Sequence, residues 1–244
     1  MSLLDATPPE LRAASSAEPT PQEIALVKTW LAAATNVHSL SNVLGCLAYS
    51  ISPAKVDLAR LAIARGADPN VSCYSGYTPL DIAVTCNTIA TPAFVALLLG
   101  AGADVNKRTP SDSTPLGDAI REMCHNEGEH RRTVLQITTM LLRAGSAIDR
   151  VEFNKSAEEQ LAYWGRIGPN HLARDEPFRV LTALVRGVRA AGSWRAYERR
   201  FHRGTLPRFR SLVVRGRATS SDALLVALAH LPHRPFRAVL AFGP

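Results

Sequence analysis

The residues that come nearest to a reactive or metal-binding site are Cys124, His125 and His130, which lie within seven positions of one another. Thiolate and imidazole groups bind zinc, but a structural zinc site needs four closely placed ligands. The chain has no C-x-x-C pair and is long enough to fold without disulfides. We therefore expect no metal site and reduced thiols at all four cysteines, Cys46, Cys73, Cys86 and Cys124.

A second candidate for chemistry is the pair of carboxylates Asp118 and Glu122, which lie four residues apart on a predicted helix. Paired carboxylates can serve as general acid and base. Acids at this spacing are more often solvated surface, and the chain has no Gly-rich phosphate loop, no H-E-x-x-H and no G-x-S-x-G. The sequence therefore predicts no enzyme and no cofactor.

The composition is that of a chain that buries a core. Of 244 residues, 46% are hydrophobic and 20% are charged, which is ordinary globular usage and suits one or two domains. Apolar stretches such as residues 94–99 end far short of the roughly 20 residues that a bilayer span needs. The N-terminal segment lacks the basic stretch of a secretory signal. We expect an intracellular protein, in the cytoplasm or nucleus, without membrane insertion.

The net charge of +7 is unevenly distributed along the chain. Residues 1–165 carry 13 basic and 17 acidic side chains, whereas residues 166–244 carry 15 basic and 4 acidic ones, and every one of those 15 is arginine. An arginine cluster such as residues 195–217 can contact phosphate. No nucleic-acid-binding motif accompanies it, so nucleic-acid binding stays an alternative beside a solvated helix face.

An internal repeat positions the rest of the chain. The segments 66–70 and 77–83 (GADPN and YTPLDIA) recur 36 residues later as GADVN and STPLGDA. In both copies the threonine is suited to cap a helix, and the proline that follows fits the first helical position. Gly66, Gly102 and Gly145 are each preceded, by four and by eight positions, by apolar residues that would share one buried face of a helix. Each of these glycines is suited to end that helix in a left-handed conformation.

These residues resemble the ankyrin repeat, whose pattern is G-x-T-P-L-H-x-A, a leucine-rich second helix and G-A-D-x-N. The resemblance implies an all-α ankyrin-repeat solenoid of about three to four helix-loop-helix repeats with hairpin-like loops, followed by a C-terminal helical extension. It further implies a protein-protein interaction module or adaptor whose partner is a protein, with binding through the projecting loops and the concave face of the first helices.

The domain organisation follows from the repeat. We expect a disordered tail over 1–19, a capping helix within 20–40, repeats over 41–155 (about 41–70, 71–106 and 107–149), a degenerate fourth repeat over 156–192 and a basic helical extension over 193–244. The third repeat is longer than the second, and we place its extra residues in a polar loop over 125–130. Residues 231–242 also resemble the start of an F-box, which would suit a ubiquitin-ligase adaptor, although a helix that caps the solenoid would look similar.

Candidate binding residues are carried over from the family pattern to matching positions. In the loops they are Ser72, Cys73, Tyr74, Ser75, Tyr77, Lys107, Arg108, Thr109, Ser111 and Asp112, and on the first helices they are Asp81, Val84 and Gly117. Asp81 and Gly117 occupy the position where the family has a histidine that braces the capping threonine.

Overall fold

The computed structural model describes residues 13–14, 16, 19–73, 76–86, 88, 91–149, 151–152, 154–168 and 172–200. The chain divides into two units between Arg186 and Gly187. The arginine-rich segment beyond residue 200, the F-box-like residues 231–242 and most of the predicted tail lie outside the described residues.

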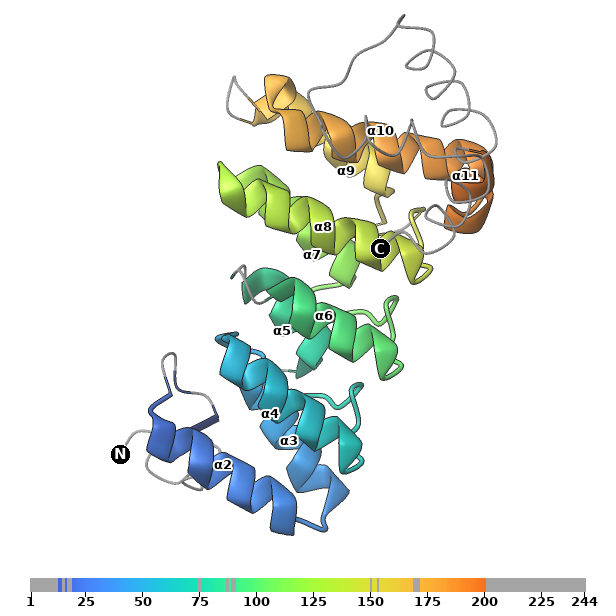
Figure 1. The fold of residues 1–244 in the computed structure, drawn as a ribbon. Helices are drawn as coiled ribbons and strands as arrows, with labels where there is room; N and C mark the ends of the chain where they lie inside the picture. The colour runs from blue at the N-terminus through green and yellow to red at the C-terminus, as the bar shows by residue number, and fades with distance from the viewer. Residues whose placement is uncertain are drawn as a thin grey trace, which may run out of the picture. The chain divides into compact units, whose positions relative to one another are not determined.

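The described part of the first unit is a stack of helix pairs. Helices α4, α6 and α8 lie side by side in one row, and α3, α5 and α7 form a second row behind them (Figure 1). Helix α2 packs against α4, and α9 packs against α7. No helix in the described ranges is long and apolar enough to cross a membrane. The bounds are α2 Pro21–Ala33, α3 Val37–Leu47, α4 Pro53–Ala64, α5 Pro79–Cys86, α6 Thr91–Gly100, α7 Pro115–His125, α8 Glu129–Arg143, α9 Ala157–Ile167, the 3₁₀ turn η3 Leu172–Arg174, α10 Glu176–Ala191 and α11 Trp194–Arg200.

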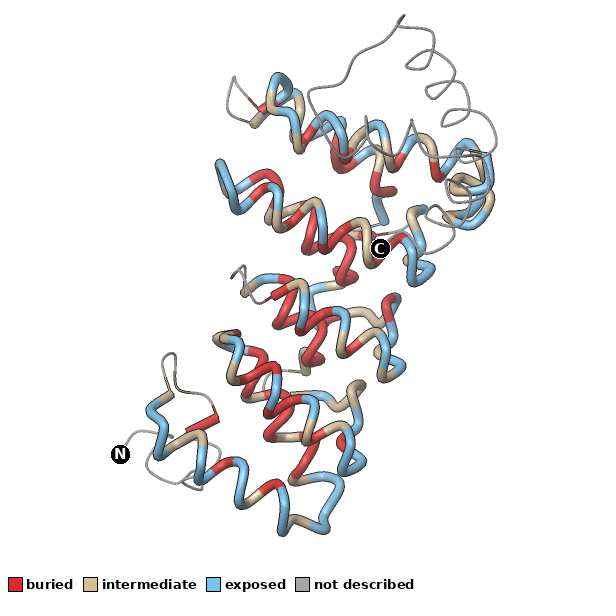
Figure 2. Tube along the Cα trace, viewed as in Figure 1, coloured by how far each residue is buried: buried red, intermediate tan, exposed pale blue. Residues whose placement is uncertain are grey.

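The core lies where the two rows meet, as the buried residues in Figure 2 show. The predicted stripes of the second helices are confirmed, because Phe94, Leu98, Ile137 and Leu141 are fully buried. Burial of a leucine or phenylalanine side chain contributes about 1.5–3 kcal/mol, so this repeated stripe contributes substantially to stability.

Each first helix begins with a side-chain cap. In α7, the Thr114 hydroxyl accepts from the Gly117 N–H at 3.3 Å. At the start of α9, Ser156 and Glu159 form a reciprocal capping box, which replaces the Thr-Pro-Leu start that this helix lacks. Helix α9 therefore starts with a different but equivalent cap.

Asparagine side chains join successive loops. The Asn70 amide nitrogen donates to the Gly102 carbonyl at 3.0 Å, and its amide oxygen accepts from the Asp104 N–H at 2.7 Å. Asn106 makes the same two bonds to the next repeat, to the carbonyl of Gly145 and the N–H of Ala147. The asparagine of the G-A-D-x-N pattern thus satisfies backbone groups of the next repeat that the helix end leaves open.

Glycine is required at the ends of the second helices. Gly66, Gly102 and Gly145 have φ values of 94°, 89° and 95°, in the left-handed region that favours glycine, which confirms the predicted helix ends.

The third repeat corrects one prediction. Its extra residues do not form a polar loop over 125–130, because α7 extends to His125 and α8 begins at Glu129. Helix α7 has 11 residues against 8 in α5, and α8 has 15 against 10 in α6. The added turn carries Arg131, which is buried, donates to the Met123 carbonyl at 3.1 Å and pairs with Asp175 at 3.2 Å. These interactions stabilise helix where the sequence suggested loop.

The first repeat begins earlier than predicted. Helix α3 starts at Val37, ahead of residue 41 where the first repeat was expected to begin, and the Asn36 side chain caps it by accepting from the N–H groups of His38 and Ser39. Asparagine is a good N-cap, so the signal was present in the sequence.

Candidate functional site

The projecting loops end in tight turns that repeat along the stack. Backbone N–H groups of Cys73, Thr109 and Val151 each donate to the carbonyl four residues on, at 2.7, 2.9 and 2.8 Å. The Arg108 side chain is held inside its turn by Asp112, at 2.5 Å. The Lys107 Nζ reaches back to the previous loop and donates to the Asn70 carbonyl at 2.9 Å. Adjacent loops are thus linked into one surface.

The predicted binding residues divide by exposure. Ser72 and Ser111 are exposed, and Cys73, Tyr77, Lys107, Arg108 and Asp112 are half-buried. Tyr74 and Ser75 lie outside the described residues. Asp81, Val84, Thr109 and Gly117 are buried. Asp81 still lines a pocket, whereas Val84, Thr109 and Gly117 do not line it and are not available as contact residues, so the assignment of these three to a binding surface is wrong.

Each of these three buried residues has a structural role. Val84 is 1% exposed and belongs to the core. The Thr109 hydroxyl accepts from the Ser113 N–H at 3.1 Å inside its own turn. A side chain at Gly117 would place its Cβ 2.5 Å from the Val151 carbonyl oxygen, so this position needs glycine to let the next loop approach.

A pocket of about 440 Å³ lies on the face of the first helices. It spans successive repeats, because α5 and α7 both contribute side chains and Tyr49 lies just after the end of α3. We call it the Asp81 pocket, and its lining residues are Tyr49, Tyr77, Asp81, Ile82, Thr85, Cys86, Asp118 and Arg121. Two of the predicted residues, Tyr77 and Asp81, therefore meet in one pocket.

One end of the Asp81 pocket contains a charge network. Arg121 pairs with Asp118 at 2.6 Å and with Glu152 at 2.9 Å. Burial raises the pKa of Asp118, and Arg121 works against that rise. Asp118 is 2% exposed, so the expectation that it is a solvated surface acid is wrong. Glu122, the other acid of the predicted pair, accepts a hydrogen bond from the Asn126 side chain at 2.9 Å.

Asp81, which also lines the pocket, braces the cap of α5. Its Oδ2 accepts from the N–H and the hydroxyl of Thr78, at 2.8 and 2.7 Å, and its own N–H donates to the Thr78 hydroxyl at 3.3 Å. Aspartate thus provides the brace at the family's histidine position. Burial raises the pKa of Asp81, the bonds from Thr78 lower it, and the nearby Asp118 raises it further.

Two of the four cysteine thiols are poor nucleophiles. Burial raises the pKa of both Cys73 and Cys124 to about 12, which keeps these thiols protonated at neutral pH. Among the described residues, no group of three or more histidine, cysteine, aspartate or glutamate side chains is placed to hold a metal ion.

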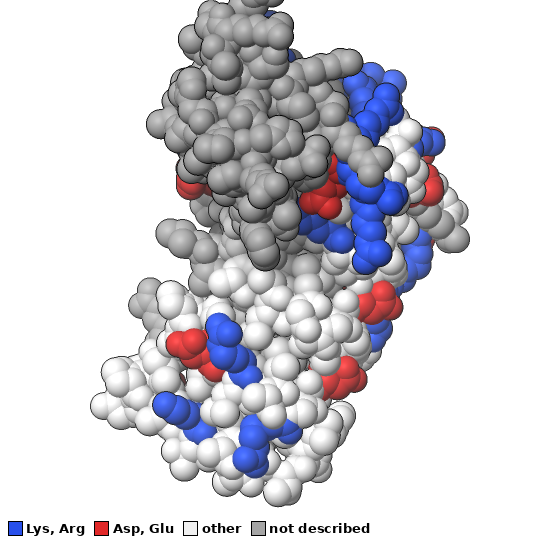
Figure 3. Space-filling model, turned by 45° about the vertical axis from the view of Figure 1, so that its right-hand side comes forward, with Lys and Arg blue, Asp and Glu red and all other residues white. Residues whose placement is uncertain are grey.

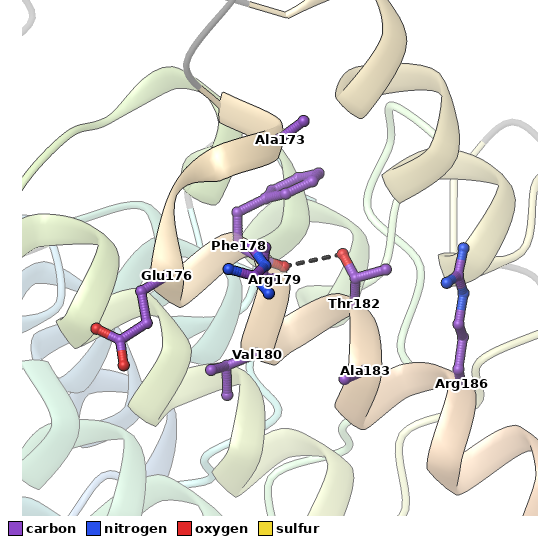
Figure 4. A pocket seen from close by; sticks show the side chains of 8 residues that line it. All are labelled: Ala173, Glu176, Phe178, Arg179, Val180, Thr182, Ala183 and Arg186. Carbon is purple, nitrogen blue, oxygen red and sulfur yellow. Dashed lines mark hydrogen bonds between the residues drawn. The ribbon is translucent and has the colours of Figure 1, made fainter.

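A second hollow, of about 630 Å³, lies along α10 (Figure 4). Its lining comes from this helix and Ala173, with Glu176 and Arg186 far apart in the view. The Thr182 hydroxyl donates to the Phe178 carbonyl at 2.8 Å, so this polar group is already bonded within the helix. The hollow lacks the converging polar groups that mark a binding site.

Basic side chains gather over part of the molecular surface, beside several acidic ones (Figure 3). Arg179, Arg186 and Arg189 are exposed along α10, and Arg186 pairs with Glu158 at 3.2 Å. An exposed pair of this kind contributes little to stability.

Comparison with known proteins identifies one repeat directly. The family model of the ankyrin repeat matches residues 75–110, which include α5, α6 and the loop that follows them. No curated protein matches the chain.

Proposed function

The chain is an ankyrin-repeat protein, and we propose that it acts as a non-enzymatic adaptor that binds a protein partner through its loops and the Asp81 pocket. The observation that carries the proposal is the family match over residues 75–110, within a stack of helix pairs whose core is buried. In such a stack the core fixes the fold, and the loops and first-helix face are the surface left for recognition.

The described loop surface suits a partner. Ser72 and Ser111 are exposed in neighbouring loops, and the Lys107 Nζ lies 3.4 Å from the Ser72 hydroxyl, which joins the two loops. Tyr77 lies beside them, with its hydroxyl 3.5 Å from that of Ser111. Tyrosine is enriched among the residues that contribute most to interface affinity, so Tyr77 is the strongest anchor among the described loop residues.

The proposal is tested by capture from cells with two matched variants. Ser72→Arg with Ser111→Arg places bulk and charge on the exposed loops, and should abolish capture of the partners that bind the wild-type chain. Ala96→Arg with Gln136→Arg makes the same change at exposed positions of α6 and α8 and should leave capture intact. Equal capture by both variants would place recognition outside the loops.

A further inference from the structure

Asp81 lines the Asp81 pocket and has one carboxylate oxygen without a hydrogen-bond partner. The residue is 2% exposed, and its Oδ2 holds both bonds from Thr78. Its Oδ1 is buried and has no hydrogen-bond partner. A buried acceptor left without a donor destabilises the folded protein, so a donor arriving from a ligand would recover that loss.

The cations near this carboxylate are held by other groups. Arg121 is occupied by Asp118 and Glu152, at 2.6 and 2.9 Å. Lys107 lowers the pKa of Asp81 from a distance, but its Nζ is bonded to the Asn70 carbonyl. Asp81 therefore keeps an unfilled acceptor, whereas Asp118 in the same pocket is paired.

The rest of the lining suits a flat cation. Tyr49 is 48% exposed and Tyr77 half-buried, and both line the pocket together with the apolar Ile82. A guanidinium group stacks on aromatic rings and donates hydrogen bonds in its own plane, which an ammonium group cannot do.

We propose that the Asp81 pocket binds an arginine side chain of the partner protein, with the guanidinium donating to Asp81 Oδ1 and packing against the tyrosines. This assignment rests on the proposed function, since it names the side chain through which the partner would be recognised.

Acetylated pentapeptides test the assignment on the full chain. Ala-Ala-Arg-Ala-Ala and Ala-Ala-Gln-Ala-Ala are titrated separately and followed by shifts of backbone amide resonances. We expect the arginine peptide to bind at least about tenfold more tightly, which corresponds to 1.4 kcal/mol. Asp81→Asn keeps an acceptor for Thr78 but removes the charge, and should abolish the difference. Glu122→Gln removes an acid of α7 that does not line the pocket, and should preserve it.

Two results would overturn the assignment: equal affinity for the two peptides in the wild-type chain, or an unchanged preference in a folded Asp81→Asn variant. If Asp81→Asn does not fold, Thr85→Arg replaces it, because this exposed lining residue would place a competing guanidinium at the pocket. A preference that survives Thr85→Arg would likewise count against the assignment. Equal affinity of the wild-type chain for the two peptides, while the loop variants still control capture, would refute the arginine assignment and leave the proposed recognition by the loops standing.

Discussion

Replacing Lys55 with methionine is expected to stabilise the protein by about 3 kcal/mol at pH 7, because burial lowers the pKa of this lysine from 10.5 to about 8. The side chain is fully buried and its Nζ has no hydrogen-bond partner. At pH 7 the folded protein must still carry most of this charge without water. Methionine has a similar length and no charge to desolvate.

The stability difference between Lys55→Met and the wild type should depend on pH. Between pH 8 and 10.5 the unfolded chain binds the Lys55 proton more tightly than the folded protein, so the wild type gains stability as pH rises. The advantage of Lys55→Met should therefore be full below pH 8 and mostly lost by pH 10.5. Urea unfolding of both proteins at pH 7 and pH 10.5 measures the difference, with exposed Lys28→Met as the control. A destabilised Lys55→Met protein, or a gain that does not change with pH, would contradict the burial of this charge.

Gly117→Ala is expected to destabilise the protein by about 3 kcal/mol, since overpacking costs about 1–3 kcal/mol and each weakened hydrogen bond about 1 kcal/mol. The new Cβ would lie 2.5 Å from the Val151 carbonyl oxygen and 2.9 Å from the Ser113 hydroxyl. That carbonyl accepts from the N–H and the hydroxyl of Thr114, at 2.9 and 3.2 Å, so it cannot retreat without weakening both bonds.

The control for this substitution is another helical glycine. A Cβ added at Gly100 in α6 would meet open space, so Gly100→Ala should be neutral or stabilising by up to about 1 kcal/mol. Denaturant unfolding compares the two variants. A Gly117→Ala protein as stable as the Gly100→Ala protein would show that the loop around Val151 does not pack on α7.

The repeat could be predicted from the sequence because its signals are local. A capping threonine, a proline at the first helical position and a glycine at a positive φ each depend on a few neighbouring residues. Helix α9 departs from this pattern, since its cap uses Ser156 and Glu159 in place of Thr-Pro-Leu. The capping-box spacing in the sequence was the signal for this start.

The site could not be predicted in the same way because it depends on packing between repeats. The sequence does not show that Asp118 is buried beside Arg121, that Arg131 reaches Asp175 from an added helical turn, or that Gly117 faces a carbonyl of the next loop. Positions carried over from the family pattern are usually exposed, but at Val84 and Thr109 the local packing buries the side chain.

Recognition by the loops and the first-helix face is tested most directly by hydrogen exchange on the full chain with and without a partner that the wild type captures. We predict slower exchange over residues 70–86 and 106–122, with little change over α6 and α8. Protection confined to α6 and α8, or to residues beyond 200, would contradict recognition by these surfaces.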